Sequence, residues 1–186
     1  MKRIVFTVIA ALFSIIASSQ EHMKFKGFDI DGSTEEFANK LTTVGFTIIN
    51  TNEKQIYGLK GEFAGYEATV VAYPNSKGIT YGIAVLYDLK DTAWKVIKAR
   101  YDNLEKNLTT KYGQPYKSVR KMKYPYNNGS GNEILGFKLG KNDYGASWLV
   151  EGVGEIVLTF QPSAIILLYN DMLNSMDDKI QAFDDL

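Results

Sequence analysis

Residues 91–115 read DTAWKVIKARYDNLEKNLTTKYGQP, and the rest of the predicted fold is arranged around this stretch. Its apolar side chains recur at intervals of three or four residues, which places them on one stripe of an α-helix. They are Trp94, Ile97, Tyr101, Leu104 and Leu108. We expect Asp91 to cap the start of the helix, and Gly113 with Pro115 to end it. Because strand-like segments flank the helix on both sides, we expect it to pack across a sheet.

The first nineteen residues have the three parts of a secretory signal peptide. Lys2 and Arg3 precede an apolar run over residues 4–16, and Ala17-Ser18-Ser19 supplies small residues for cleavage. The run is shorter than the roughly 20 residues that span a bilayer. We therefore expect cleavage after Ser19 and a secreted or periplasmic mature chain without a membrane span. A retained N-terminal anchor is the alternative, but the chain has no Cys to carry a lipoprotein anchor or a disulfide.

The composition is that of a globular domain with balanced charge. The 21 basic residues are matched by 21 acidic ones, so the sequence indicates no patch able to neutralise phosphates and no nucleic acid partner. Twelve Tyr and ten Phe are typical of a β-rich chain. We predict a single α+β domain over residues 20–186.

A second helix is predicted nearer the N-terminus, and eight predicted strands follow it along the chain. Ser33 and Glu36 form a capping box, which begins a helix that carries Phe37, Leu41 and Val44 on one face and ends at Gly45. The expected strands alternate in polarity or are rich in β-branched residues, and turn residues separate them. They cover residues 46–50, 55–63, 67–73, 80–87, 117–124, 133–139, 147–150 continuing to 155–160, and 164–169. An additional short strand is expected within residues 23–30.

The two halves of the chain resemble each other. In residues 23–88 and again in 91–170, a helix is followed by strands, and the last strand ends in Tyr87-Asp88 or Tyr169-Asn170. We interpret this order as a diverged duplication, although short apolar strands can also resemble each other by chance. The predicted fold is one mostly antiparallel sheet built from two helix-plus-strands units, with both helices on one face. A short C-terminal helix is expected from the spacing of Met172, Met176, Ile180 and Phe183.

The sequence offers little catalytic chemistry. His22 is its sole histidine and lies near the expected new N-terminus, and no nucleotide-binding or metal-binding motif occurs. We therefore predict no cofactor and no metal site. Five acids lie near predicted strand ends, which leaves open a secreted hydrolase that uses paired carboxylates. They are Glu62, Glu67, Glu133, Glu151 and Glu155.

Aromatic and amide side chains gather in the predicted loops of the second half. Tyr124, Tyr126, Tyr144 and Asn128 can stack on a sugar or grip a peptide, so they are the candidate ligand-binding residues. Tyr also occurs at sheet edges merely to expose its hydroxyl to water. The function we expect is a non-catalytic secreted or periplasmic binding module for a protein, peptide or glycan. A hydrolase and a structural protein of the cell envelope are the alternatives.

Several turn and cap motifs carry a resemblance to other proteins. They are His22–Gly27, Ile30–Ser33, Gly45-Phe46, Phe63–Tyr66 and Lys111–Pro115. With them the chain resembles a group of secreted proteins of Bacteroidetes-type gut bacteria. This resemblance implies export but assigns no activity or site residue. The predicted units of helix and antiparallel strands are also similar in architecture to modules of the β-lactamase-inhibitor-protein type.

Overall fold

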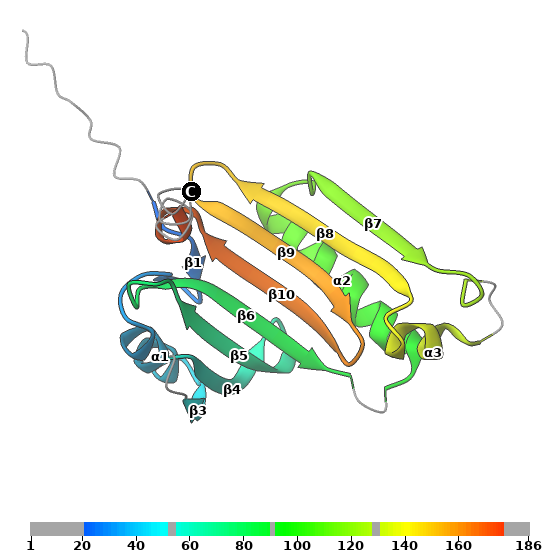
Figure 1. Cartoon of the computed structure of the whole chain (residues 1–186), viewed down its shortest axis with the longest axis horizontal. Coiled ribbons are helices and arrows are strands. Elements are labelled where there is room, and N and C mark those ends of the chain that lie inside the picture. The colour runs from blue at the N-terminus through cyan, green and yellow to red at the C-terminus, as the bar shows by residue number, and fades with distance from the viewer. Residues whose placement is uncertain (1–20, 52–54, 90–91, 128–130, 177–186) are drawn as a thin grey trace, which may run out of the picture.

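The fold is α+β and centres on one eight-stranded antiparallel sheet (Figure 1). The computed structural model describes residues 21–51, 55–89, 92–127 and 131–176. The strand order is β3-β4-β5-β6-β10-β9-β8-β7, and a separate two-stranded ribbon pairs β1 with β2. The predicted fold class is therefore confirmed.

The first half of the chain supplies one side of the sheet. Its elements, in chain order, are β1 (Lys24–Phe25), β2 (Phe28–Asp29), α1 (Thr34–Thr42), β3 (Thr47–Thr51), β4 (Tyr57–Phe63), β5 (Tyr66–Pro74) and β6 (Thr80–Asp88). The second half supplies the other side. Its elements are α2 (Trp94–Tyr112), β7 (Lys117–Met122), α3 (Glu133–Lys138), β8 (Asn142–Val150), β9 (Gly154–Gln161) and β10 (Ala164–Asp171).

Helix α1 begins at the predicted capping box. The Ser33 side chain accepts from the Glu36 N–H at 3.2 Å, and the Glu36 carboxylate accepts in return from the Ser33 N–H. Phe37 and Leu41 are buried, as their spacing predicts, but Val44 was wrongly placed on this face, because α1 ends at Thr42 and Val44 is 41% exposed. Gly45 has a φ of 95°, and the chain then turns back so that the Phe46 N–H donates to the Leu41 carbonyl.

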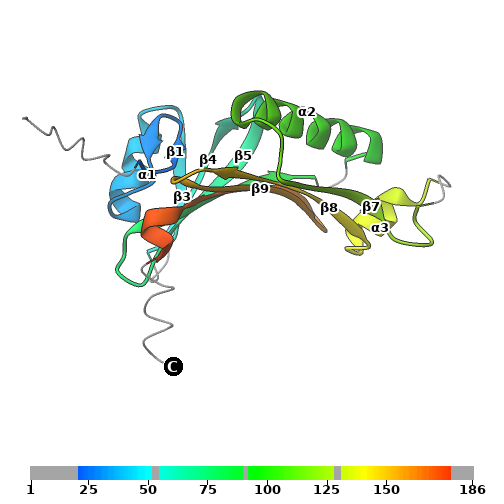
Figure 2. The same cartoon turned by 90° about the horizontal axis from the view of Figure 1, so that it is seen from above.

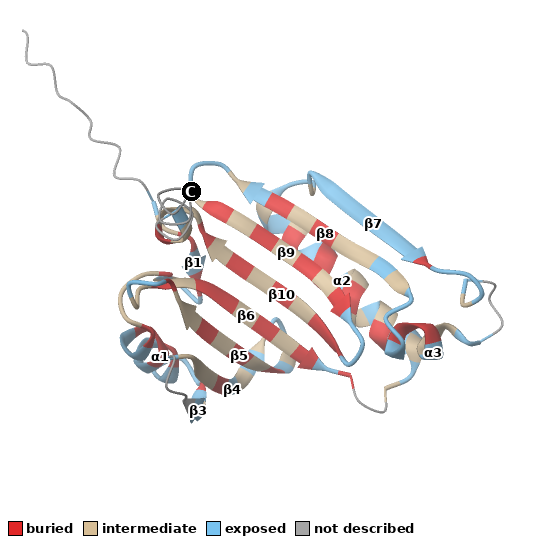
Figure 3. Cartoon of the chain, viewed as in Figure 1, coloured by how far each residue is buried: buried red, intermediate tan, exposed pale blue. Residues whose placement is uncertain are grey.

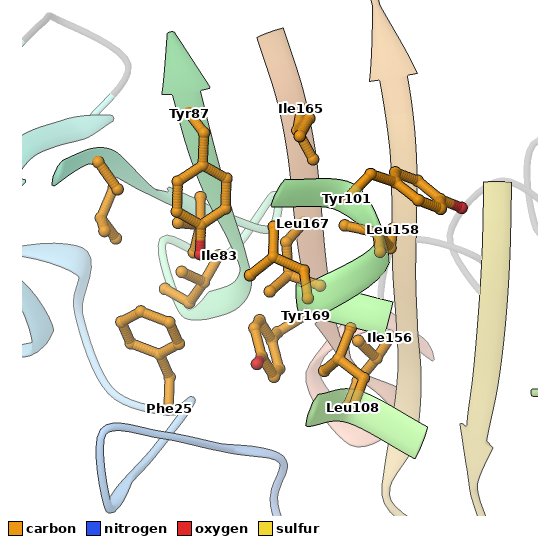
Figure 4. Close-up of a cluster of buried hydrophobic side chains, with 14 of the residues drawn as sticks. Phe25, Ile83, Tyr87, Tyr101, Leu108, Ile156, Leu158, Ile165, Leu167 and Tyr169 are labelled. Carbon is orange, nitrogen blue, oxygen red and sulfur yellow. The ribbon is translucent and has the colours of Figure 1, made fainter. Parts of the chain in front are cut away.

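Helix α2 buries the predicted stripe against the sheet (Figure 4). Ile97, Tyr101, Leu104 and Leu108 are buried, whereas Trp94 at the first turn is half-buried. The predicted cap was wrong, because the helix begins after Ala93, which provides no side-chain hydrogen bond; Asp91 itself lies outside the described residues. The helix ends at Gly113, whose φ of 84° favours glycine.

The two halves are arranged alike about the middle of the sheet. In each half a helix precedes four strands that are consecutive neighbours, and the final strands, β6 and β10, pair with each other antiparallel. This order agrees with the predicted units, but the duplication itself stays a prediction.

Three predicted segments differ from the structure. Residues 147–150 were expected to continue as a strand into 155–160, but a turn at 151–153 separates β8 from β9, and the two strands pair antiparallel. Residues 133–139 were expected to be a strand, but Glu133–Lys138 form the helix α3, whose Phe137 packs against Trp94 and Phe160. A hexapeptide is too short for its apolar pattern to distinguish a strand from a helix, so tertiary packing decided. Residues 23–30 form the β1–β2 hairpin rather than one strand.

The predicted C-terminal helix begins directly after β10. Residues 172–176 are helical, whereas Ile180 and Phe183 lie outside the described residues. Asp171 caps this helix, since its Oδ1 accepts the Asn174 N–H at 2.8 Å.

Candidate functional site

One face of the eight-stranded sheet carries α1 and α2; on the other face the helical residues 172–176 lie at one end (Figure 1). Figure 2 shows the sheet edge-on as an arch, with α2 on the outer side of the bend and the opposite face on the inner side. We call this second surface the open face. Burial alternates along the strands, as Figure 3 shows, so that Ile156, Leu158 and Phe160 of β9 are buried beneath the helices while Val157 and Thr159 point to the open face.

Apolar side chains continue across the open face from one half of the sheet to the other. The printed registers place Val71, Ala84, Leu168 and Val157 in one row of neighbours on four adjacent strands. A second row holds Leu86, Ile166, Thr159, Gly145 and Val119. The apolar residues of the first row are all partly exposed. A solvated sheet face normally carries polar side chains, so these rows call for an explanation.

A hollow of about 520 Å³ lies on this face near the β7 edge. Its floor contains Gly145, whose missing side chain leaves space between Val119 and Thr159, its register partners on β7 and β9. Lys117 and Gln161 contribute polar groups at the margin. A Cβ added at Gly145 would find its nearest neighbour at 3.6 Å, so the hollow has room for a side chain.

A second hollow, of about 450 Å³, lies at the opposite end of the open face. It is lined by Tyr81, Tyr116, Leu149, Gly154, Glu155, Asn170, Met172 and Ser175. The Tyr116 hydroxyl donates to Glu155 at 2.6 Å, and this bond, followed by a smaller effect of burial, raises the pKa of Tyr116. Leu149 is 65% exposed at its rim. This hollow thus combines an apolar rim with a carboxylate and an amide.

Tyr73 lies across the open face between the two halves. Its ring covers Gly82, and its hydroxyl donates to Asn170 Oδ1 at 3.0 Å. Burial raises the pKa of Tyr73 to about 12, and the neighbouring Tyr81 adds to this effect. The hydroxyl therefore stays protonated at neutral pH, as this hydrogen bond requires.

The four residues predicted to bind a ligand are not brought together as one site. Tyr144 is half-buried among the rings of Trp94, Tyr101 and Phe160, and so belongs to the core on the helix side. Tyr126 is also half-buried, and its Cβ and ring fill the space above Gly136. Tyr124 is 84% exposed. Asn128 lies outside the described residues, and whether any of the four binds a ligand stays a prediction.

The acids near strand ends form no enclosed pair among the described residues. Glu62 and Glu67 are direct register partners, but both are exposed, and Lys60 pairs with Glu67. Glu133 lies in α3, which precedes β8, and Glu151 lies in the turn that follows β8, so the length of this strand separates them. A general acid of a glycosidase needs an environment that raises its pKa, typically an apolar pocket. The exposed setting of Glu62 and Glu67 does not provide one.

A buried polar cluster connects both ends of the described chain. The Asn174 amide donates to the Ile30 carbonyl, Asp31 and the Thr80 carbonyl, each at about 3 Å. Burial by itself would raise the pKa of Asp31, but hydrogen bonds from Gly32 and Asn174, with the charges of His22 and Lys40, lower it below the ordinary value. All polar groups of this cluster have partners, which indicates a structural role.

The sequence did contain a signal for the open face. Residues 164–168 read AIILL, an apolar run without the alternation expected of a strand that has one solvated face. Such a run indicates that both faces of β10 are apolar. The role of Gly145 could not be seen in the sequence, because its position in the floor of the hollow depends on pairing with both neighbouring strands.

Within the part of the chain that the structure describes, no three acidic or histidine side chains lie close enough to hold a metal ion. The described helices include none that is both long and apolar enough to cross a membrane. No family model, curated protein or solved structure matches this chain.

Proposed function

We propose that this chain is a non-catalytic binding module, secreted or periplasmic, that uses the open face of its sheet to bind a protein partner. The observation that carries the proposal is the pair of apolar rows on this face. Val71, Val157 and Leu168 are partly exposed on this face, where a solvated sheet would normally carry polar side chains. Soluble proteins rarely expose a continuous apolar surface, and where they do, it usually marks a site of interaction with another molecule.

The shape of the face supports a protein rather than a small ligand. The inner side of the arch (Figure 2) accepts a convex surface. Two hollows at its ends can receive projecting side chains. An apolar centre bordered by polar groups is typical of protein interfaces. The charged margin includes Lys117 and Lys121 on one side and Glu62 and Glu67 on the other.

Filling the larger hollow tests the proposal. We expect Gly145→Leu to retain the fold, because its backbone does not require glycine and the nearest atoms leave room for a Cβ. The side chain would occupy the space that a partner's side chain enters. Val157→Glu, at the centre of the first row, is a second variant that places a charge in the interface.

The experiment is capture of envelope or culture-supernatant proteins with the mature chain as bait, followed by measurement of the dissociation constant with each captured protein. The matched control is Val44→Ser, because Val44 is 41% exposed and lies beyond the end of α1. Loss of affinity of at least about tenfold in both face variants, with none in the control, supports the proposal. Equal affinity of all four chains would overturn it, as would binding of glycans alone on a glycan array.

A further inference from the structure

The outer edge of β7 differs from the opposite edge of the sheet. β3 is five residues long, and its register with β4 is interrupted between Ile48 and Asn50. β7 runs for six residues in unbroken register with β8, and its first five residues are exposed. A short, irregular edge resists pairing with another strand, whereas a regular edge permits it.

The hydrogen-bond pattern shows which backbone groups of β7 face outward. Lys123 donates its N–H to the Lys141 carbonyl at 2.9 Å, and hydrogen-bonded pairs alternate along an antiparallel ladder. Residues 117, 119 and 121 therefore bond inward to β8. The N–H and C=O groups of Ser118 and Arg120 point to the free edge, where they can bond a further strand.

The side chains of β7 divide between the two faces of the sheet. On the helix side, Arg120 pairs with Asp102 at 2.9 Å and with buried Glu105, and Ser118 donates to Glu105 at 3.1 Å. Burial alone would lower the pKa of Arg120, but these two carboxylates raise it. The charges on that side are thus already balanced.

On the open-face side the charges are not balanced. Lys117, Val119 and Lys121 follow one another at alternate positions, and all three are exposed. Asp143, the register partner of Lys121, pairs with Lys123 at 3.0 Å. Neither Lys117 nor Lys121 has an ion pair with a carboxylate in the described ranges.

We propose that the edge of β7 binds an extended acidic segment of a partner as a ninth antiparallel strand. Residues 117, 119 and 121 would form the pairs without hydrogen bonds, in which facing side chains approach most closely. The segment should place an acid opposite Lys121, an apolar residue opposite Val119 and an acid opposite Lys117. This gives the pattern acidic–any–apolar–any–acidic. The inference deepens the proposed function and rests on it for the existence of a partner.

Lysines on an edge strand can also serve simply to prevent aggregation. The two roles differ in one respect: a protective edge has no preference for any added strand. A recognition edge discriminates between peptides of opposite charge at the positions that face Lys117 and Lys121.

The test uses two dye-labelled peptides and fluorescence anisotropy with the mature chain. The first peptide is Thr-Asp-Thr-Val-Thr-Asp-Thr, and the second carries Lys in place of both Asp. We expect the acidic peptide to bind about tenfold more tightly, since each opposed charge pair adds a modest preference. N-methylation of the backbone nitrogens that face β7 should abolish binding, because pairing depends on those N–H groups.

Charge reversal supplies the decisive comparison. Lys117→Glu combined with Lys121→Glu should reverse the preference in favour of the Lys peptide. The matched control, Lys95→Glu with Lys106→Glu, makes the same change in net charge at exposed positions of α2 and should leave the preference unchanged. The inference would be overturned if neither peptide binds, if binding survives N-methylation, or if the control variant also reverses the preference.

The outcome is separable from that of the proposed function. Gly145→Leu fills the hollow beside Val119 but leaves the outward backbone groups of β7 in place, so peptide affinity should change by less than about threefold. Loss of partner binding in this variant with retained peptide binding supports both statements. If the peptide binds but partner binding does not change in the Gly145 and Val157 variants, the β7 edge remains a binding site. The proposed role of the open face would then be rejected.

Discussion

The backbone N–H of Met23 donates a 2.7 Å hydrogen bond to the fully buried carboxylate of Asp171, 148 residues further along the chain. The same carboxylate lies 3.2 Å from His22 Nδ1 and caps the helix at residues 172–176 through Asn174. Asp171 therefore ties the first described residues to the last strand. This link supports the first prediction.

Replacement of Asp171 by Ala should lower the free energy of unfolding by about 3 kcal/mol, because buried N–H donors lose a charged acceptor. Urea denaturation at neutral pH measures the change. Asp29→Ala is the matched control, since Asp29 is exposed and pairs with exposed Lys24; it should cost no more than about 0.5 kcal/mol. Similar losses in both variants would contradict a special role for the buried carboxylate.

Asp31 should make stability depend on acid pH. Its pKa in the folded chain lies below the ordinary value, so its contribution is present above the unfolded pKa and is lost as pH falls through the folded pKa. Asp31→Asn should therefore destabilise the protein more at about pH 6 than at about pH 3. Urea midpoints at both pH values provide the measurement, and an equal penalty at the two would show that Asp31 does not act through its charge.

The tyrosines of the second half should separate into a core residue and a surface residue. Tyr144→Ala removes a ring that contacts Trp94, Tyr101 and Phe160, and should cost about 2–4 kcal/mol. Tyr124→Ala should cost no more than about 0.5 kcal/mol, because the side chain is 84% exposed. Thermal denaturation of the two variants checks this, and a larger loss for Tyr124 would reverse the assignment.

Gly82 and Tyr73 should depend on each other. A Cβ at position 82 would lie 2.2 Å from the Tyr73 ring, so Gly82→Ala must displace it and should cost about 1–3 kcal/mol. In the Tyr73→Ala background the same change should cost much less, because the ring is gone. The four denaturation curves of this double-mutant cycle give the coupling. Additive effects would mean that the ring does not rest on Gly82. Gly58→Ala, whose new Cβ has neighbours no nearer than 3.6 Å, is the control.

Some features were determined by the sequence because they depend on residues close together in the chain. The stripe from Ile97 to Leu108 spans several helical turns, so chance agreement with the helical period is small, and the structure confirms it. The Ser33–Glu36 capping box involves residues three apart, and it formed as predicted. The fold class followed from the same local patterns.

Other features were decided by tertiary structure, because they depend on segments distant in the chain. Residues 133–138 carry a pattern that suits either a strand or a helix, and packing of Phe137 against Trp94 and Phe160 favoured the helix. Tyr144 was predicted to lie in or beside a loop, whereas it lies on β8 and its ring faces the aromatic rings beneath α2.

The candidate surface depends on tertiary structure most of all. A strand's sequence alternates between two faces but does not state which face the helices will cover. Only the pairing of β6 with β10 brings Ala84 beside Leu168 in one continuous row. Likewise, β7 is an edge only because no strand follows it in the sheet order, and strand order is set by contacts between residues far apart in the chain.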